Sequence, residues 1–547
     1  MVRKVPKRLV QKIESVPAPI GGLNSRDGIA AMPSTDAVNL VNWQPDTYGV
    51  RCRKGFKEWV INIPGDLPVE SIMSFFSATT TIPGGTFLTD PTSMPGFLFA
   101  ATQDGIYDIT TTTDAPVLSQ ALSGSDFAGW FSHTMIVNSA GSPFLLATSE
   151  ADGYFRFDGA VWTQVTMGAG AGQVSNVDPA DFVHVAVWKR RAWFVEKDTT
   201  KAWYLPVDSV SGAAAAFDFG PQFKKGGHLS YLANWTIDAG EGIDDFLVAV
   251  GSNGDVVVYK GTDPTSADTF GVVGTWYVGQ IPAGRRAYTQ FGGDLIIVSA
   301  DGVFPISYVT RGGAEFLQAS SKEYTSKIRP TIGEDLRASF TSRGWQAMVH
   351  PSERVMMINV PDYGSVSEKQ FAMSTTLNSW CIYKDIPIYS LGISVGYAFA
   401  GTRDGRVLLI LSGFFDDVAY GESTGNGIRG VIQPAFNTFE TPVQDKIFGM
   451  LRTNFLSIDT PSFMVGINVN YSLAQPISTP SAPSSSSSLW DVSDWDVSVW
   501  GGEQRVFTQW NTIGGIGFSG TASLVTTTVA DTVLASIDYM YQIGAPF

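Results

Sequence analysis

Short runs of apolar and β-branched residues alternate with polar turns along most of this chain. Residues 99–110 read FAATQDGIYDIT, and residues 399–410 read FAGTRDGRVLLI. In each stretch the apolar positions lead to an Asp-Gly pair and then resume, which is typical of two antiparallel strands joined by a tight turn. Glycine suits such turns because it adopts positive φ without a Cβ clash, and Asp tolerates that conformation better than most residues. The pattern therefore predicts hairpins at Asp104-Gly105 and Asp404-Gly405.

The same pattern recurs three more times, at Asp152-Gly153, Asn253-Gly254 and Asp301-Gly302. Successive glycines stand 48, 101, 48 and 103 residues apart, so the larger gaps are close to twice the smaller ones. Weaker copies fit into these gaps at 186–206 and 347–361, and residues 370–383 add another hairpin-like unit. Repeats of roughly 40–50 residues with several strands each predict a β-propeller, here of about six or seven blades. A plain series of hairpins in a sandwich is the alternative.

The pattern changes on both sides of the repeats. We expect three regions: residues 1–65, a propeller over 66–420, and residues 421–547. In the last region, residues 463–473 and 521–543 alternate apolar and polar positions like half-buried strands of a β-sandwich. A Ser/Pro-rich loop at 476–488 separates these two stretches, because its composition cannot bury enough apolar surface to become ordered.

Three smaller segments stand out on either side of the repeats. The N-terminus is a basic arm interrupted by prolines, with its first charges on Arg3, Lys4, Lys7 and Arg8. Ser34 or Thr35 could begin a short helix, with Asp36 in its first turn. Three tryptophans follow the Ser/Pro-rich loop at a five-residue spacing that matches neither strand nor helix. These residues are Trp490, Trp495 and Trp500. We interpret their side chains as contacts with a neighbouring surface. Burial at ordinary core positions is the alternative.

Length and composition fit an all-β protein of more than one domain. The chain has 547 residues, exceeding the roughly 250–300 at which a single core stops growing. Aromatic residues reach 12%, glycines number 57, and no stretch sustains a helical apolar stripe over several turns. Cys52 and Cys381 are the only cysteines, so no disulfide framework is expected. We expect no signal peptide and no stable membrane insertion, because no run of about 18 apolar residues occurs.

Charge and motifs offer little for catalysis. The net charge of −15 argues against tight binding of nucleic acid through phosphates. The four histidines, His133, His184, His228 and His350, lack metal-ligand spacing. A glycosidase would need two carboxylates at a set separation, and the sequence nominates no pair. Lys189–Arg191 lie between aromatic residues, where a solvated hairpin tip is favoured over a stacking site. We therefore expect no enzymatic activity, no catalytic residue, no cofactor and no metal ion.

Three stretches of the chain carry a resemblance to a known family. Residues 18–56 read APIGGLNSRDGIAAMPSTDAVNLVNWQPDTYGVRCRKGF, residues 435–452 read AFNTFETPVQDKIFGMLR, and residues 484–502 read SSSSSLWDVSDWDVSVWGG. Together with the hairpin repeats they resemble the tail nozzle proteins of short-tailed bacteriophages, also called tail tubular protein B-like. The resemblance covers most of the chain.

This resemblance implies a structural role in the virion tail. Such proteins form a homohexameric ring below the portal and its adaptor, the head-tail connector, where they extend the DNA channel, retain the genome and open during ejection. By resemblance, residues 1–65 and 421–547 build the platform of the ring. Expected partners are further copies of the chain, the adaptor, tail fibres or spikes, and DNA in transient passage. The basic arm and the three tryptophans are the expected partner contacts, and assembly takes place in the host cytoplasm.

Two other functions are compatible with the same pattern. One is a receptor- or glycan-binding tail protein, including a depolymerase, built on the propeller. The other is an adaptor or stopper ring, although such proteins are usually short and helical.

Overall fold

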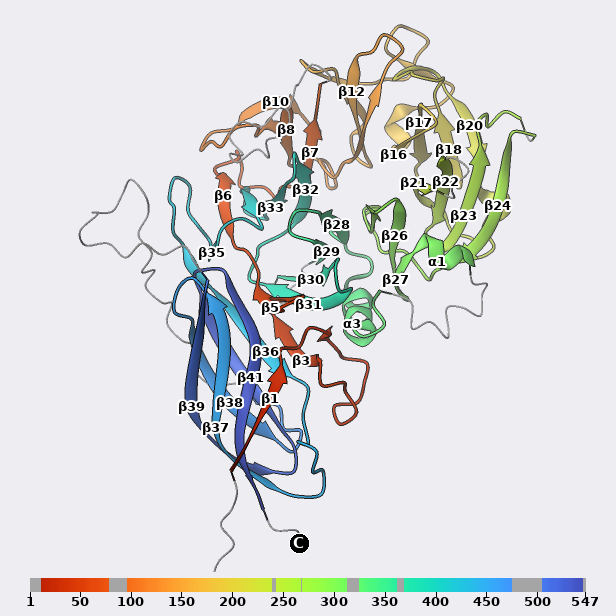
Figure 1. The fold of residues 1–547 in the computed structure, drawn as a ribbon. Coiled ribbons are helices and arrows are strands. Elements are labelled where there is room, and N and C mark those ends of the chain that lie inside the picture. Colours follow the sequence, from red (N-terminus) through yellow and green to blue (C-terminus); the bar gives the residue numbers. More distant parts are fainter. Residues whose placement is uncertain are drawn as a thin grey trace, which may run out of the picture. The chain divides into compact units, whose positions relative to one another are not determined.

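The computed structural model describes residues 11–77, 96–238, 243–266, 268–311, 324–361, 368–474 and 504–544. Nearly all regular structure in these ranges is β-strand, as expected (Figure 1). The chain forms two compact units. The first comprises residues 1–57, 370–386 and 411–547, and the second comprises residues 58–369 and 387–410.

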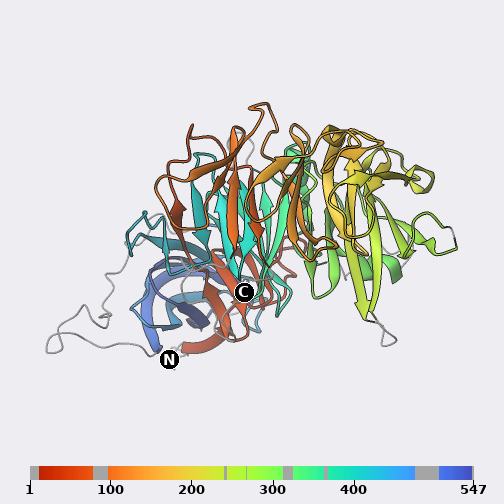
Figure 2. The ribbon, with the colours of Figure 1, turned by 90° about the horizontal axis from the view of Figure 1, so that it is seen from above.

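The second unit is a β-propeller. Its sheets follow one another along the chain from orange through yellow and green to teal, and Figure 2 shows them from above. Among the described residues, seven innermost strands line one axial cavity, so the propeller, expected to have about six or seven blades, has seven there. These strands are β7 (Ser71–Phe75), β11 (Ser132–Val137), β16 (Phe182–Trp188), β21 (Leu229–Asp238), β25 (Tyr288–Phe291), β28 (Gln346–His350) and β32 (Ser390–Ser394).

The outer strands pair antiparallel in chain order within each blade. In the first three blades they are β8 (Phe97–Ala101), β9 (Gly105–Asp108), β10 (Val117–Ala121), β12 (Pro143–Ser149), β13 (Gly153–Phe157), β14 (Trp162–Gln164), β17 (Arg191–Glu196), β18 (Lys201–Tyr204) and β20 (Ala215–Asp218). In the following blades they are β22 (Ile243–Gly251), β23 (Asp255–Gly261), β24 (Phe270–Tyr277), β26 (Asp294–Ser299), β27 (Gly302–Pro305), β29 (Val355–Val360), β33 (Tyr397–Gly401) and β34 (Val407–Ile410).

The ring of blades is closed by a strand from the beginning of the unit. Strand β6 (Phe56–Val60) lies next to β34, so the last blade has the order β32-β33-β34-β6. An ion pair of 2.7 Å connects Glu58 of β6 with Arg406, the residue directly before β34. Connections carry the remaining short elements: β15 (Val174–Ser175), β19 (Gly212–Ala213), the 3-10 turns Pro179–Asp181 and Gly220–Gln222, and the helices α1 (Ile306–Arg311) and α3 (Arg329–Ser339).

The repeated Asp-Gly and Asn-Gly pairs all lie between the second and third strands of a blade, which confirms the predicted hairpins. Glycine was expected in these turns because they need a positive φ. This holds for Gly153, Gly254, Gly302 and Gly405, which have φ of 72°, 93°, 137° and 73°. For Gly105 that reason is wrong. A Cβ atom there would stand 3.0 Å from the carbonyl oxygen of Gln120 on the next strand, so the close approach of that backbone favours glycine here.

Aromatic side chains fill the space between neighbouring blades. Phe75 and Phe97 from the first blade contact Phe157 of the second at centroid distances of 5.1 and 5.3 Å, both edge to face. Between the third and fourth blades, Trp188 lies 5.6 Å from Phe270. Aromatic pairs in this geometry stabilise beyond their buried area, so the blades form a closely packed ring.

The first unit consists of two packed sheets, as the sandwich-like expectation proposed. One sheet has the order β39 (Arg505–Gly517), β37 (Lys446–Ser457), β41 (Thr532–Ile543), β5 (Gly49–Cys52) and β4 (Trp43–Asp46), and β1 (Gln11–Pro17) also pairs with β41. In the other, β30 (Lys369–Ser374), β31 (Ser379–Lys384), β3 (Asp36–Val41), β36 (Asn426–Pro434), β40 (Gly520–Thr528) and β38 (Ser462–Val469) follow in order, with β2 (Gly22–Leu23) on β3 and β35 (Phe415–Asp416) on β36.

Side chains from both sheets meet in the core of this unit. The indole Nε1 of Trp43 donates to Oγ1 of Thr526 at 3.1 Å, and the rings of Phe455 and Phe463 lie 5.1 Å apart. Figure 1 shows β1, in red, alongside the blue C-terminal strands. Its register pairs Gln11 with Gln542 and Pro17 with Ser536. Strands β1 and β41, the first and last described strands, therefore belong to one folded unit.

Two details differ from the sequence-based expectation. The helix proposed to begin at Ser34 or Thr35 is wrong, because β3 occupies Asp36–Val41. Asp36 is buried and accepts a hydrogen bond from Nδ2 of Asn24 at 2.7 Å, while Ala37 and Leu40 face the core. The compact units divide at 57/58 and 410/411 rather than at 65/66 and 420/421, and residues 370–386 join the first unit. Strand β6 explains the first shift, because it belongs to the last blade.

Candidate functional site

The expected partner contacts lie outside the described residues. This holds for Arg3, Lys4, Lys7, Arg8, Trp490, Trp495 and Trp500, and for the Ser/Pro-rich loop at 476–488. Lys189 and Arg190 form the tip of the β16–β17 hairpin, as favoured, and each pairs with an aspartate, Asp245 and Asp208 respectively. In the ranges that the structure covers, no helix has the length and apolar character needed to span a bilayer.

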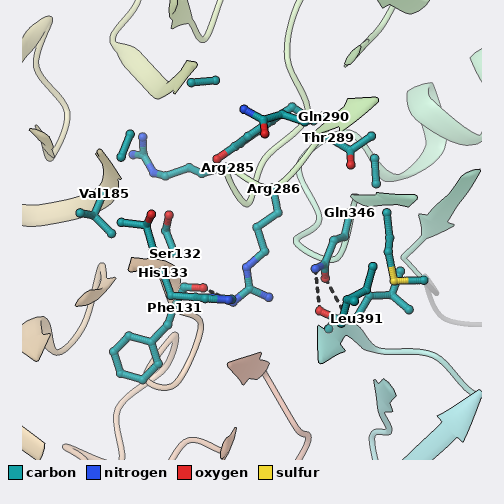
Figure 3. Close-up of a pocket in the computed structure, with 18 of the residues that line it drawn as sticks. Phe131, Ser132, His133, Val185, Arg285, Arg286, Thr289, Gln290, Gln346 and Leu391 are labelled. Atoms are coloured by element: carbon teal, nitrogen blue, oxygen red, sulfur yellow. Dashed lines mark hydrogen bonds between the residues drawn. The ribbon is translucent and has the colours of Figure 1, made fainter. Parts of the chain in front are cut away.

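One polar cavity of the propeller lies on its axis. This cavity of about 590 Å³ runs between the seven innermost strands, and all of its lining residues belong to the propeller unit. Figure 3 shows Arg285 and Arg286 entering it from the segment before β25. Every lining side chain in the described cavity is apolar, uncharged polar, histidine or arginine. The axis therefore carries positive charge in a chain whose net charge is −15.

Arg286 extends from the fifth blade to the first and second. Its Nη1 donates to the carbonyl oxygen of Glu70 at 2.9 Å, and its Nη2 donates to the carbonyl oxygen of Phe131 at 2.5 Å and to Oγ of Ser71. The guanidinium also lies 3.8 Å from the ring centroid of Trp130. Desolvation lowers the pKa of Arg286 to about 9. The side chain remains charged at neutral pH and crosses the axial cavity.

Arg285 connects the fifth blade to the fourth and second. It donates to the carbonyl oxygens of Leu229 and Ser230 at 3.1 and 2.7 Å, and its Nε pairs with Oε1 of Glu150 at 3.1 Å. The other carboxylate oxygen of Glu150 accepts from Nη2 of Arg343 at 2.8 Å. Burial raises the pKa of Glu150, but the two arginines outweigh that effect and lower it.

A histidine and two tyrosines join further blades near the axis. Nε2 of His184 lies 3.1 Å from the hydroxyl of Tyr288, whose ring stacks on Tyr231 at 4.4 Å. Nδ1 of His184 is buried and has no hydrogen-bond partner in the described part of the chain. Burial and the charge of Arg285 lower the pKa of His184 to about 3. This imidazole is therefore neutral at physiological pH.

The arrangement is suited to rigidity and to attraction of anions. The axial guanidinium groups are held by backbone carbonyls from several blades, so they do not need to reorganise when a negative group approaches. No cluster of three or more His, Cys, Asp or Glu with metal-binding geometry occurs among the residues described.

Gln346 connects the sixth blade with the seventh. Its side-chain amide donates to the carbonyl oxygen of Leu391 at 2.7 Å and accepts from the backbone amide of Leu391 at 3.0 Å (Figure 3).

Sequence reasoning did not single out these axial residues. Wide separation in sequence does not keep residues of a propeller apart, because its innermost strands meet at the axis. Arg285-Arg286 had one available signal, a pair of arginines directly before an inner strand in an acidic chain. The residues that face these two arginines could not be inferred from the sequence, because closure of the ring brings them together.

Comparisons with known proteins add little about this chain. No family model and no curated protein matches it. Among solved structures, the extracellular domain of a hybrid two-component system from B. thetaiotaomicron aligns with 10% identity and a TM-score of 0.38, covering 68% of this chain and 45% of that one. Raptor from Chaetomium thermophilum aligns with 12% identity and a TM-score of 0.35, covering 66% and 28%. The chain thus spans less than half the length of either structure that it matches here.

Proposed function

We propose that this chain is a structural subunit of a bacteriophage tail that assembles with further copies into a nozzle ring. The ring extends the DNA channel below the portal and adaptor and takes part in genome retention and ejection. The sequence resemblance of residues 18–56, 435–452 and 484–502 supports this proposal. The subunit acts through its surfaces, without enzymatic activity, and is located in the virion tail.

The structural observation that carries the proposal is the outermost strand of the first unit. Strand β39 pairs with β37 along one edge, and it is the terminal strand of its sheet in the described part of the chain. It is 13 residues long, and its apolar side chains Val506 and Ile516 are 65% and 63% exposed. Long exposed edge strands are templates for pairing with another chain, which monomeric proteins avoid.

A closed ring needs two different complementary surfaces on each subunit. Strand β39 offers one such surface, and the rigid propeller offers a stiff body that leaves few free strand edges. A net charge of −15 is compatible with passage of DNA, since an acidic lumen repels phosphates. These properties favour an assembly component that handles DNA without holding it.

Immunogold electron microscopy on phage particles containing this chain tests the proposal. Gold at the distal end of a short tail, at one capsid vertex, is the expected result. Label on peripheral fibres or spikes would instead favour the receptor- or glycan-binding alternative. Particles without label would contradict a virion role altogether.

A further inference from the structure

A second cavity of the propeller lies where the innermost strands begin. It measures about 830 Å³, which is in the range of small-molecule sites. Its walls come from turns and strand starts of six blades, all within the propeller unit. Three arginines and two glutamates line it: Arg285, Arg343, Arg403, Glu70 and Glu150. These five groups carry a formal charge of +1, opposite in sign to the whole chain.

Two of the three arginines in this cavity lie against aromatic rings. The guanidinium carbon of Arg343 lies 3.4 Å from the ring centroid of Phe127, and that of Arg403 lies 5.3 Å from Tyr389. Phe127 is 56% exposed and has a φ of 75°, in the left-handed region that a bulky side chain rarely adopts. Strain of this kind is concentrated at ligand sites.

The cavity also has hydrogen-bonding capacity that the protein does not use. Nη1 of Arg343 is buried and has no partner among the described residues, while its Nη2 is used by Glu150. A buried donor without an acceptor costs free energy, which a ligand oxygen would recover. Both carboxylate oxygens of Glu150 are already occupied by arginines, so this glutamate does not neutralise the remaining donor.

The lining identifies the chemistry of the ligand. Fork-shaped guanidinium groups recognise carboxylates and phosphates. Hydroxyl and amide side chains along the wall suit a ligand that is rich in hydroxyl groups: Ser230, Ser252, Asn253, Gln280, Thr341 and Ser342. A bare inorganic anion would leave this polar wall and the exposed ring of Phe127 without a partner.

We propose that this cavity binds a sugar that carries a carboxylate or a phosphate group. The oxyanion pairs with Arg343 and Arg403, and the sugar ring lies against Phe127 and the hydroxyl-bearing wall. Glu70 opposes binding when it is ionised. Burial raises the pKa of Glu70 to about 7, and Arg286, Arg343, Arg403 and the hydroxyl of Tyr389, 3.4 Å from its Oε1, partly offset that effect.

Isothermal titration calorimetry on the full chain at pH 8 provides the test. The titrants are glucuronate, glucose 6-phosphate, neutral glucose, inorganic phosphate and AMP. We expect glucuronate or glucose 6-phosphate to bind with a Kd below ~10 mM, and glucose to bind more weakly by at least about tenfold. Comparing the two acidic sugars distinguishes a carboxylate ligand from a phosphate ligand.

Variants locate the site. Arg403→Gln should weaken binding by about tenfold, because it removes a charged donor from an exposed position. Glu70→Gln should tighten binding several-fold at pH 8, because it removes a negative charge. Arg190→Gln is the matched control, since Arg190 is an exposed arginine at a hairpin tip outside this cavity, and its affinity should equal that of the wild type.

Three results would overturn the inference. Inorganic phosphate binding as tightly as glucose 6-phosphate would reduce the cavity to a simple anion site. AMP binding more tightly than either acidic sugar would assign it to nucleotides. No binding of any titrant would remove the site. Each result is independent of where the chain lies in a phage particle, so this inference and the proposed function can fail separately.

Discussion

Arg53 is held by all three chain segments that form the first unit. Its guanidinium pairs with both carboxylate oxygens of Asp416 at 2.6 and 2.7 Å, and it also bonds Oδ1 of Asn42 at 2.9 Å and the carbonyl of Lys384 at 3.0 Å. The side chain is fully buried. One residue thus joins segments that are more than 300 positions apart in the sequence.

Replacing Arg53 with Met should destabilise this unit by about 3–5 kcal/mol, because Asp416 would stay buried without a counter-charge. Urea-dependent hydrogen exchange of β3 and β36 measures the change in unfolding free energy. The double variant Arg53→Met, Asp416→Leu should recover part of the loss. Arg26→Met is the control, because the exposed Arg26–Asp27 pair should contribute less than about 1 kcal/mol. Equal losses in R53M and R26M would contradict the role of Arg53.

His184 makes the stability of the propeller dependent on pH. The pKa of His184 is about 3 in the folded protein, against 6.5 for a histidine in the unfolded chain. At pH values between these two, only the unfolded chain takes up the proton. Stability should therefore be complete above pH 6.5 and fall as the pH decreases, by about 1.4 kcal/mol per unit from this residue.

His184→Gln should remove that contribution while keeping a polar group near Tyr288. Between pH 7.5 and pH 5, the wild type should lose about 2 kcal/mol more unfolding free energy than the variant. Urea denaturation at the two pH values, followed by hydrogen exchange of β16 and β21, measures both losses. Equal losses in the two proteins would show that this histidine does not titrate as its burial implies.

At the scale of elements, strand β39 is the surface on which the proposed ring depends. Lysine on an edge strand blocks strand addition, because a neighbouring sheet cannot cover its charge cheaply. Val506→Lys together with Ile516→Lys should therefore reduce self-association of the chain by at least about tenfold, with little change in the melting temperature. Sedimentation velocity or mass photometry over a concentration series measures the association.

Val443→Lys is the matched control for that pair of substitutions. Val443 is 88% exposed but lies outside the strands, so its replacement should leave association unchanged. If the double lysine variant assembles like the wild type, β39 is not a subunit contact.

Some elements of the fold could be predicted from the sequence and others could not. Hairpins were predictable because each Asp-Gly or Asn-Gly turn and its flanking strands lie within 12 to 19 consecutive residues, and the regular spacing of these turns indicated the propeller. Strand β3 was misassigned because its partners are remote: Val41 pairs with Val431 and with Ile382. Local propensity allowed a helix at Ser34, and tertiary pairing overrode it. The cavities were not predictable for the same reason, since ring closure brings their residues together.

At the scale of the whole molecule, the first unit cannot be complete before the C-terminal strand is made. Strand β41 pairs with β37 on one side and with β1 and β5 on the other. Truncation after residue 531 should therefore expose the amides of β37 and β1 to rapid hydrogen exchange. The inner strands β11, β16 and β21 should keep their slow exchange, because the propeller closes through β6 and β34 without β41. Mass spectrometry of both regions in one sample makes the propeller an internal control. Slow exchange in β37 of the truncated chain would show that the first unit folds without its central strand.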